Sequence, residues 1–235
     1  HAHDWTTFPA AVSAKHISGK PLVVHVHITQ FDMVGGDGRI NQMAYDIERY
    51  GMHEADIVIA VSDYIKNRLM SQYDVPEHKI RVLHNAATPM NANIGAGPIK
   101  IKSSDKIVLF AGRVTLQKGP DYFVRAARLV LDKDPNVKFV MAGTGDMLHR
   151  MIELSADLGM ADKFIFPGFY SRHEAEKLFA MADCFVMPSV SEPFGIVPLE
   201  AMQKGTPAQS QTVREAIETG SVERLSDIVA IVRET

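Results

Sequence analysis

The chain has 235 residues, 46% of them hydrophobic, and can therefore form one large or two small domains with a sizeable buried core. Its net charge of −3 provides no basic excess, so charge alone favours neither nucleic acid nor an acidic membrane as a partner. The single cysteine, Cys184, excludes an internal disulfide, and no apolar run is long enough to cross a bilayer, so we expect a cytoplasmic protein.

The first part of the chain alternates between predicted strands and helices. Apolar runs mark its predicted strands at residues 22–28, 56–61 and 79–83. Residues 38–55 have helical character, and Ser62 is a plausible N-cap for a further helix. This alternation is typical of a parallel sheet covered on both faces. Because His1 stands where a strand would end, we expect this first domain, residues 1–88, to be incomplete.

A change in composition separates this part from the next. Residues 85–104 are dominated by Ala, Asn, Gly and Pro without periodicity, so we place an interdomain linker at residues 89–104. Strand–turn–helix units then resume over residues 105–207, as in a doubly wound α/β domain. Its predicted strands are residues 107–111, 137–142, 164–166 and the run at Cys184. Its predicted helices are residues 121–131, 147–158 and 173–181, with a further helix after Gly195.

Two cations follow the predicted strand that ends at Ala111. Arg113 and Lys118 lie in a loop bounded by glycines, Gly112-Arg113-Val114-Thr115-Leu116-Gln117-Lys118-Gly119. Arginine can bind two phosphate oxygens at once and lysine adds a point charge, so the pair suits a diphosphate. Taken alone, the loop is better explained as two solvated surface cations. The carboxylates that follow later in the chain favour the diphosphate.

Those carboxylates, Glu192 and Glu200, flank Gly195 where a loop is predicted to turn into a helix. The loop follows the apolar run at Cys184, so the order is buried strand, glycine turn and helix. This order directs free backbone N–H groups at an anion, while carboxylates accept hydrogen bonds from sugar hydroxyls. We therefore predict a site for a phosphorylated sugar. The alternative is a loop charge and an exposed helix residue, which fits Glu192 poorly because Pro193-Phe194-Gly195 is apolar.

Histidines gather near the start of the chain. On extended strands His1 and His3 would share one face, as would His25 and His27. Four imidazoles on neighbouring strand ends could form a metal site. We expect no metal there, because no carboxylate or cysteine has supporting ligand spacing.

A second glycine turn, Gly143-Thr144-Gly145, follows the strand predicted at residues 137–142. Two interpretations remain open. The glycines either permit tight packing between strand and helix, or permit the close approach of a ligand.

The string from Glu192-Pro193-Phe194-Gly195 to Leu199-Glu200-Ala201-Met202 resembles the E-x7-E motif of retaining nucleotide-sugar glycosyltransferases of the GT-B type. Family 4 and the related glycogen and starch synthases are the most similar. The resemblance covers the chain from about His1 to Pro207, and it implies two Rossmann-like α/β domains, the first of them truncated at its N-terminus. After Pro207 the family would continue with an apolar strand. Residues 208–235 begin with a polar stretch instead, and we predict an atypical helical tail there.

The resemblance also implies roles for particular residues. Arg113 and Lys118 would hold the donor diphosphate, and Glu200 the ribose hydroxyls. Glu192 and His3, which stands in the string His1-Ala2-His3-Asp4-Trp5, would contact the transferred sugar. The remaining donor contacts implied are the backbones of Phe194, Gly195 and Ile196, the turn at Gly143 and Gly145, and base stacking by Phe169 or Tyr170. Either aromatic residue could equally belong to the core.

We therefore expect a hexosyltransferase that moves a sugar from a nucleotide diphosphate sugar to a hydroxyl of a saccharide or other acceptor, with retention and without a metal or cofactor. Residues 30–38 look closest to glycogen-synthase-like relatives, which gives a mild preference for a glucosyl donor. One alternative is a catalytically impaired fragment that binds the nucleotide sugar. A glycoside hydrolase also uses paired carboxylates, but it needs no basic loop for a diphosphate.

Overall fold

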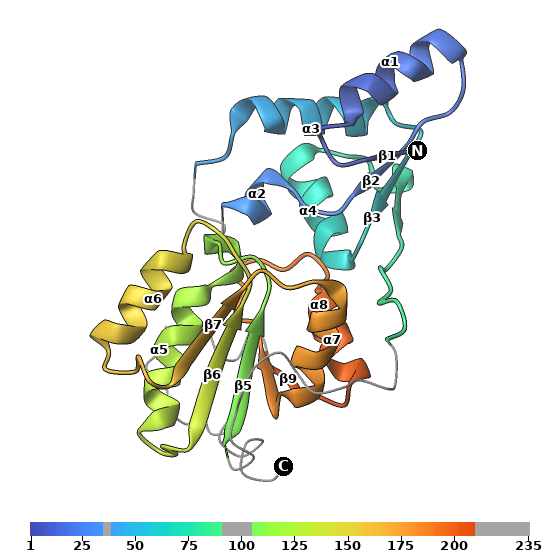
Figure 1. The fold of residues 1–235 in the computed structure, drawn as a ribbon. Coiled ribbons are helices and arrows are strands. Elements are labelled where there is room, and N and C mark those ends of the chain that lie inside the picture. The colour runs from blue at the N-terminus through green and yellow to red at the C-terminus, as the bar shows by residue number, and fades with distance from the viewer. Residues whose placement is uncertain (35–38, 91–104, 210–235) are drawn as a thin grey trace. The chain divides into compact units, whose positions relative to one another are not determined.

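The computed structural model describes residues 1–34, 39–90 and 105–209, which form two compact units (Figure 1). The first unit comprises His1–Ala86 together with Ser191–Gly195, and the second comprises Ala87–Val190 and the chain from Ile196 onward. Each unit is built around its own parallel sheet, so the chain is an α/β protein, as its sequence predicted.

The described strands of the first unit are parallel and lie in the order β1-β2-β3-β4. They are β1 (Ala2–His3), β2 (Val23–Val26), β3 (Ile57–Ala60) and β4 (Ile80–Val82). The helices are α1 (Phe8–Ser18), α2 (Gln30–Met33), α3 (Gln42–Glu54) and α4 (Asp63–Tyr73), and a short 3-10 turn, η1, covers Glu77–Lys79. The hydroxyl of Ser62 accepts a hydrogen bond from the backbone N–H of Ile65, which confirms the predicted cap of α4.

Helix α1 was not predicted, and it packs closely on α3. A Cβ added to Gly51 of α3 would lie 2.4 Å from the ring of Phe8, so only glycine allows this approach. Pro9 stands in the first turn of α1, and Gly19 ends the helix in the left-handed conformation. Phe8 thereby joins the core of the first unit, which also contains Val24, Met52, Val58, Leu69 and Tyr73.

The second unit contains a sheet of five described strands in the order β7-β6-β5-β8-β9, all parallel. They are β5 (Lys106–Ala111), β6 (Val137–Ala142), β7 (Phe164–Gly168), β8 (Cys184–Val186) and β9 (Ala208–Gln209). The helices are α5 (Pro120–Leu131), α6 (Leu148–Asp157), α7 (Arg172–Met181) and α8 (Ile196–Gln203), with a 3-10 turn, η2 (Leu116–Lys118), before α5.

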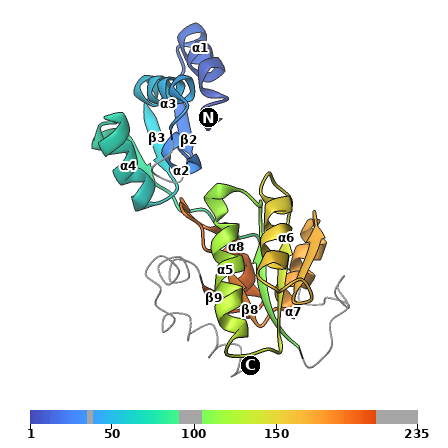
Figure 2. The same ribbon diagram turned by 90° about the vertical axis from the view of Figure 1, so that its left-hand side faces the viewer.

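Alternate side chains of β5 enter the two cores of this unit. Val108 and Phe110 pack with residues of α5 and α6, which lie along the same face of the sheet (Figure 2). Ile107 and Leu109 point to the opposite face and pack with residues of α7 and α8. Helices therefore cover both faces, which is why the strands read as continuous apolar runs in the sequence. The thiol of Cys184 is buried here, and burial raises its pKa to about 12, as befits an inert core cysteine.

The polar stretch after Pro207 begins with a strand, which the sequence did not predict. Ala208–Gln209 form β9, which pairs in parallel with β8. The backbone N–H groups of Phe185 and Met187 donate to the carbonyls of Pro207 and Gln209, both at 2.8 Å. Such backbone bonds add a strand to a sheet edge without requiring apolar side chains. The rest of the predicted tail, residues 210–235, and most of the predicted linker lie outside the described residues.

Candidate active site

The order of strands in the second unit creates a switch point at the carboxyl end of its sheet. The chain builds β6 and β7 on one side of β5 and then returns to place β8 on the other side. The loops that follow β5 and β8 therefore leave neighbouring strands at the same edge, where open α/β sheets bind ligands. Arg113 and Lys118 come directly after β5, and Glu200 lies on α8, the helix after β8.

The loop after β5 packs backbone to backbone on the loop after β6. A Cβ on Gly143 would lie 1.8 Å from the carbonyl oxygen of Gly112, and one on Gly145 would lie 2.2 Å from that of Val114. The backbone N–H of Val114 donates to the carbonyl of Thr144 at 2.9 Å. The two glycines are thus required for tight packing, although of loop on loop rather than of strand on helix as the first of their two interpretations had it. Their contact with a ligand stays a prediction.

The same loop is also fastened to the loop after β8. The backbone N–H of Val190 donates to the carbonyl of Gln117 at 2.9 Å. Gly119 ends η2 in the left-handed conformation, and a Cβ there would lie 2.2 Å from the carbonyl oxygen of Pro188. The backbone that carries the two cations is therefore fixed from both sides, which reduces the entropy that a bound anion would otherwise have to remove.

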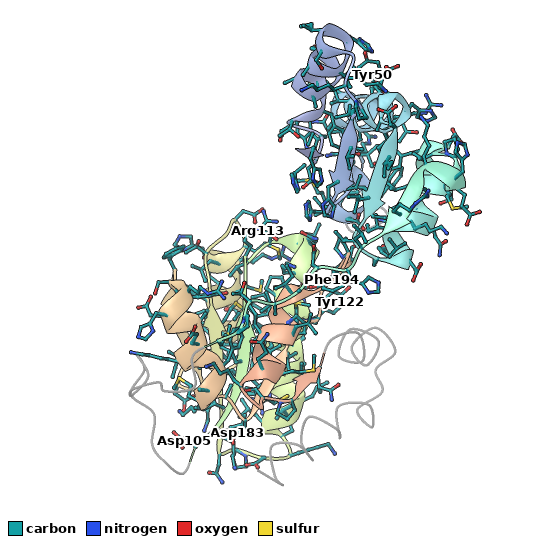
Figure 3. The ribbon with its side chains drawn as sticks, turned by 90° about the vertical axis from the view of Figure 1, so that its right-hand side faces the viewer. Tyr50, Asp105, Arg113, Tyr122, Asp183 and Phe194 are labelled. Carbon is teal, nitrogen blue, oxygen red and sulfur yellow. The ribbon has the colours of Figure 1, made fainter. Side chains whose placement is uncertain are left out.

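The two cations differ in exposure. Arg113 is exposed and makes no ion pair with a described residue, whereas Lys118 is half-buried. Figure 3 shows Arg113 at the end of the second unit opposite to Asp105 and Asp183. Arg113 is thus available to an anionic ligand at the carboxyl edge of the sheet, as the diphosphate role requires.

Glu200 lies among polar and aromatic groups of α7 and the residues before it. Burial raises the pKa of Glu200, while nearby Arg172 acts in the opposite direction. Burial and the charge of Glu200 together raise the pKa of Tyr170 to about 12. Tyr170 also packs against the core, whereas Phe169 is 80% exposed and is not a core residue. Phe169 is therefore the aromatic side chain that remains available for stacking on a base.

The segment Ser191–Gly195 is grouped with the first unit, which the sequence did not predict. The hydroxyl of Ser62 donates to the carbonyl of Pro193 at 2.6 Å, and Phe194 packs against the core of the first unit. Glu192 therefore belongs to the first unit and Glu200 to the second. The backbone of Gly195 has φ 84, a conformation that favours glycine, just before α8 begins at Ile196.

A buried aspartate that sequence reasoning missed also holds this segment. Asp32 has no exposed surface, and its Oδ1 accepts hydrogen bonds from Arg68 Nη1 and Ser191 Oγ, both at 2.7 Å. Its Oδ2 accepts from the backbone N–H and the hydroxyl of Thr29, forming the capping box of α2. The spacing Thr29-x-x-Asp32 was the one available signal, because Arg68 and Ser191 are distant in sequence.

The histidines of β1 and β2 form one cluster. Strand pairing places His3 opposite His25, and His3 Nδ1 and His27 Nε2 lie 2.9 Å apart, at hydrogen-bonding distance. His25 and His27 stack with ring centroids 4.1 Å apart. Burial and the neighbouring His27 and His3 lower the pKa of His25 to about 4, so it is neutral near pH 7. His3 is exposed and accessible to a ligand.

A groove of about 520 Å³ also lies on the first unit, beside the Asp32 network. Arg68 lines it and lies over the ring of Tyr64, 4.8 Å from its centroid. The other lining residues are Phe31, Asn67, Ser71 and Gln72. The groove is open and combines two aromatic rings with side chains that can form hydrogen bonds to a ligand.

No helix in residues 1–34, 39–90 or 105–209 has the length and apolar composition required to cross a membrane.

Two family models match the chain, with little unmatched sequence between them. Residues 96–219 match the model described as glycosyl transferases group 1, and residues 1–89 match glycosyltransferase family 4. An uncharacterized glycosyltransferase of Methanocaldococcus jannaschii is 36% identical over 223 residues, which are 91% of this chain and 57% of that protein. The D-inositol 3-phosphate glycosyltransferase of Mycolicibacterium smegmatis is 28% identical over 227 residues, 91% of this chain and 51% of that protein.

Solved structures share the fold. The Anabaena protein HepE, crystallised with UDP and glucose, matches with a TM-score of 0.72 at 19% identity, over 88% of this chain and 56% of that one. The chain spans about half the length of the curated relatives that it matches.

Proposed function

Because the chain belongs to the group 1 glycosyl transferases of the GT-B fold, we propose that it transfers a sugar from a nucleotide diphosphate sugar to an acceptor hydroxyl, with retention of configuration. The observation that carries this proposal is the switch point of the second sheet. Strands β5 and β8 are neighbours in that sheet, so the segments that follow them begin at the same edge. Arg113 and Lys118 lie in the first of these segments, and Glu200 lies in the second.

Each residue has a defined task in this reaction. When the bond to the sugar breaks, negative charge builds on the departing diphosphate, and Arg113 and Lys118 stabilise it. The carboxylate of Glu200 accepts hydrogen bonds from the ribose, and Phe169 stacks on the base. From the first unit, Glu192 and His3 contact the transferred sugar. These assignments require no metal, because the two cations supply the positive charge.

The finer details of the substrates are also proposals. The donor is a uridine diphosphate sugar, and a glucosyl donor is preferred. The structural relative HepE was crystallised with UDP and glucose, which supports this choice. The acceptor is a saccharide or another hydroxyl compound, and the groove beside Asp32, with its hydrogen-bonding side chains, is the surface that we assign to it.

Binding of UDP measured by calorimetry tests the proposal. The wild-type chain should bind UDP, and Arg113→Ala should weaken binding by roughly tenfold to a hundredfold, since a hydrogen bond between charged groups contributes about 1.5–3 kcal/mol. Arg125→Ala is the matched control, because Arg125 is an exposed arginine on α5 and lies outside this edge. Equal losses in both variants would refute the assigned site.

A product assay with the glucosyl donor then separates the remaining alternatives. Transfer to an acceptor supports the transferase, whereas UDP binding without transfer supports the impaired binding fragment. Release of sugar from a glycoside that carries no nucleotide would instead indicate a hydrolase.

A further inference from the structure

Four imidazoles lie on one face of the first two strands. The parallel register pairs His3 of β1 with His25 of β2, while His1 lies just before β1 and His27 just after β2. The ring centroids of His1 and His3 are 4.6 Å apart, and those of His3 and His25 are 5.2 Å apart. The fold itself therefore brings these side chains together from positions more than twenty residues apart.

Three of these histidines are close enough to share one ion. Each of His1, His3 and His25 offers a ring nitrogen, and these atoms all lie within 4.8 Å of one another. A tetrahedral zinc ion with Zn–N bonds of about 2.05 Å requires nitrogens about 3.4 Å apart. His1 is exposed, so its side chain can change rotamer and bring its ring nitrogen closer to those of His3 and His25.

His25 has hydrogen-bonding capacity that the protein leaves unused. Both its ring nitrogens are buried and lack a hydrogen-bond partner among the described residues. A buried polar atom without a partner costs about 1–3 kcal/mol, which is rare unless another ligand completes the site. A metal ion bound by one nitrogen of His25 would relieve part of this cost.

The ring of His27 can orient the side chain of His3 through a hydrogen bond. His3 Nδ1 lies 2.9 Å from His27 Nε2, and a proton carried on His3 Nδ1 leaves the lone pair of its Nε2 free for a metal. The backbone N–H of His27 donates to Asp4 Oδ1 at 2.8 Å, which fixes the position of His27. Hydrogen bonding to the second ring nitrogen is the usual arrangement around metal-ligating histidines.

We propose that His1, His3 and His25 bind a divalent transition metal, Zn²⁺ by preference, with His27 as a positioning residue. A set of three imidazoles suits zinc and leaves a fourth position for water. Sequence reasoning expected no metal because it looked for a carboxylate or cysteine at ligand spacing. Three histidines that the pairing of β1 with β2 brings together can bind zinc without a carboxylate or a cysteine.

The metal would compete with one step of the proposed function. A zinc ion on His3 withdraws that side chain from the donor sugar, so zinc should inhibit transfer while UDP still binds through the second unit. This consequence rests on the proposed function. The metal site itself does not, because zinc binding is measured without any nucleotide.

Zinc binding to the intact chain, measured by competition with a chromogenic chelator, tests the site. One Zn²⁺ should bind per chain, and His25→Asn should weaken binding at least a hundredfold. His1→Ala, at an exposed position with little effect on folding, should also weaken it strongly. His27→Gln should weaken it by about tenfold, as losses of supporting hydrogen bonds do. His78→Gln is the control, because His78 is an exposed histidine of the same unit outside the cluster.

Two results would overturn the proposal. One is unchanged zinc affinity in His25→Asn, which would show that the segment His1-Ala2-His3 alone chelates the ion. The other is an equal loss of affinity in His78→Gln, which would show nonspecific binding. Circular dichroism on each variant shows whether the chain is still folded. Because His1 is exposed, His1→Ala removes a metal ligand without disturbing the core. The visible spectrum of the Co²⁺-substituted chain reports directly whether the site is tetrahedral.

Discussion

Glu200 shows how the environment of one side chain limits what it can do. Its carboxylate is partly buried near Tyr170 and Arg172, and burial raises its pKa. A carboxylate accepts hydrogen bonds from hydroxyls but repels phosphate oxygens, which is why we propose that Glu200 binds the ribose and that Arg113 and Lys118 bind the phosphates.

The first prediction concerns that division. Glu200→Gln should weaken UDP binding by about tenfold, because the amide replaces a charged acceptor of the ribose hydroxyls. Binding of inorganic pyrophosphate, which has no ribose, should stay unchanged in the same variant. Calorimetry with both ligands makes the comparison. A parallel loss for pyrophosphate would place Glu200 beside the phosphates and contradict the assignment.

A second prediction concerns Glu48, a buried carboxyl of the first unit. Tyr73 donates a hydrogen bond to it, but burial is the larger effect and raises the pKa of Glu48 to about 7. The folded chain thus holds a proton that the unfolded chain releases near pH 4.5. The resulting stability is fully present below about pH 4.5 and is lost as the pH rises through about 7, by up to roughly 3 kcal/mol.

Urea unfolding between pH 4 and 8 measures this effect. Glu48→Gln should remove the decline, because the amide does not titrate over this range. Glu153→Gln, at an exposed position on α6, should leave it intact. A wild-type decline that persists in Glu48→Gln would assign the titration to another group.

At the scale of elements, the active-site edge depends on loops that touch through their backbones. Gly145 illustrates this, because a Cβ there would lie 2.2 Å from the carbonyl oxygen of Val114. Gly145→Ala should therefore destabilise the chain by about 3 kcal/mol, as overpacked positions do, and should also weaken UDP binding by displacing the loop after β5.

Thermal and urea unfolding measure the first effect, and calorimetry the second. The control is Gly205→Ala, where the backbone has φ 80 but a Cβ would meet nothing within 4 Å. It should cost only about 1 kcal/mol and leave UDP binding unchanged. Equal behaviour of the two variants would show that the close approach of the loops does not shape the site.

The elements also show what the sequence could and could not predict. Buried strands such as β3 and β6 were found from apolar runs, because a parallel sheet covered on both faces leaves few polar positions. Helix α1 was missed although Pro9 and Gly19 mark its ends, since its 11 residues carry no clear apolar stripe. Strand β9 was missed because it has only two residues, in a polar stretch, and joins the sheet through backbone hydrogen bonds.

On the scale of the whole molecule, the family string predicted the α/β fold with its two parallel sheets. It could not predict that Ser191–Gly195 is grouped with the first unit, because that depends on Asp32 and Ser62, more than a hundred residues away in sequence. The histidines at the start of the chain were expected on neighbouring strand ends, and the pairing of β1 with β2 brings them together. Contacts between distant residues, rather than local propensity, decided both.

The proposed reaction accordingly draws on both units. The second supplies Arg113, Lys118 and Glu200 for the nucleotide, and the first supplies His3 and Glu192 for the sugar. The three residues proposed to bind the nucleotide all lie in the second unit.

The position of the diphosphate in a crystal structure with bound UDP tests this claim most directly. We predict phosphate oxygens within hydrogen-bonding distance of the Arg113 guanidinium and the Lys118 ammonium, with the ribose on Glu200. Phosphates bound at any other edge of the second sheet, or on the first unit alone, would contradict it.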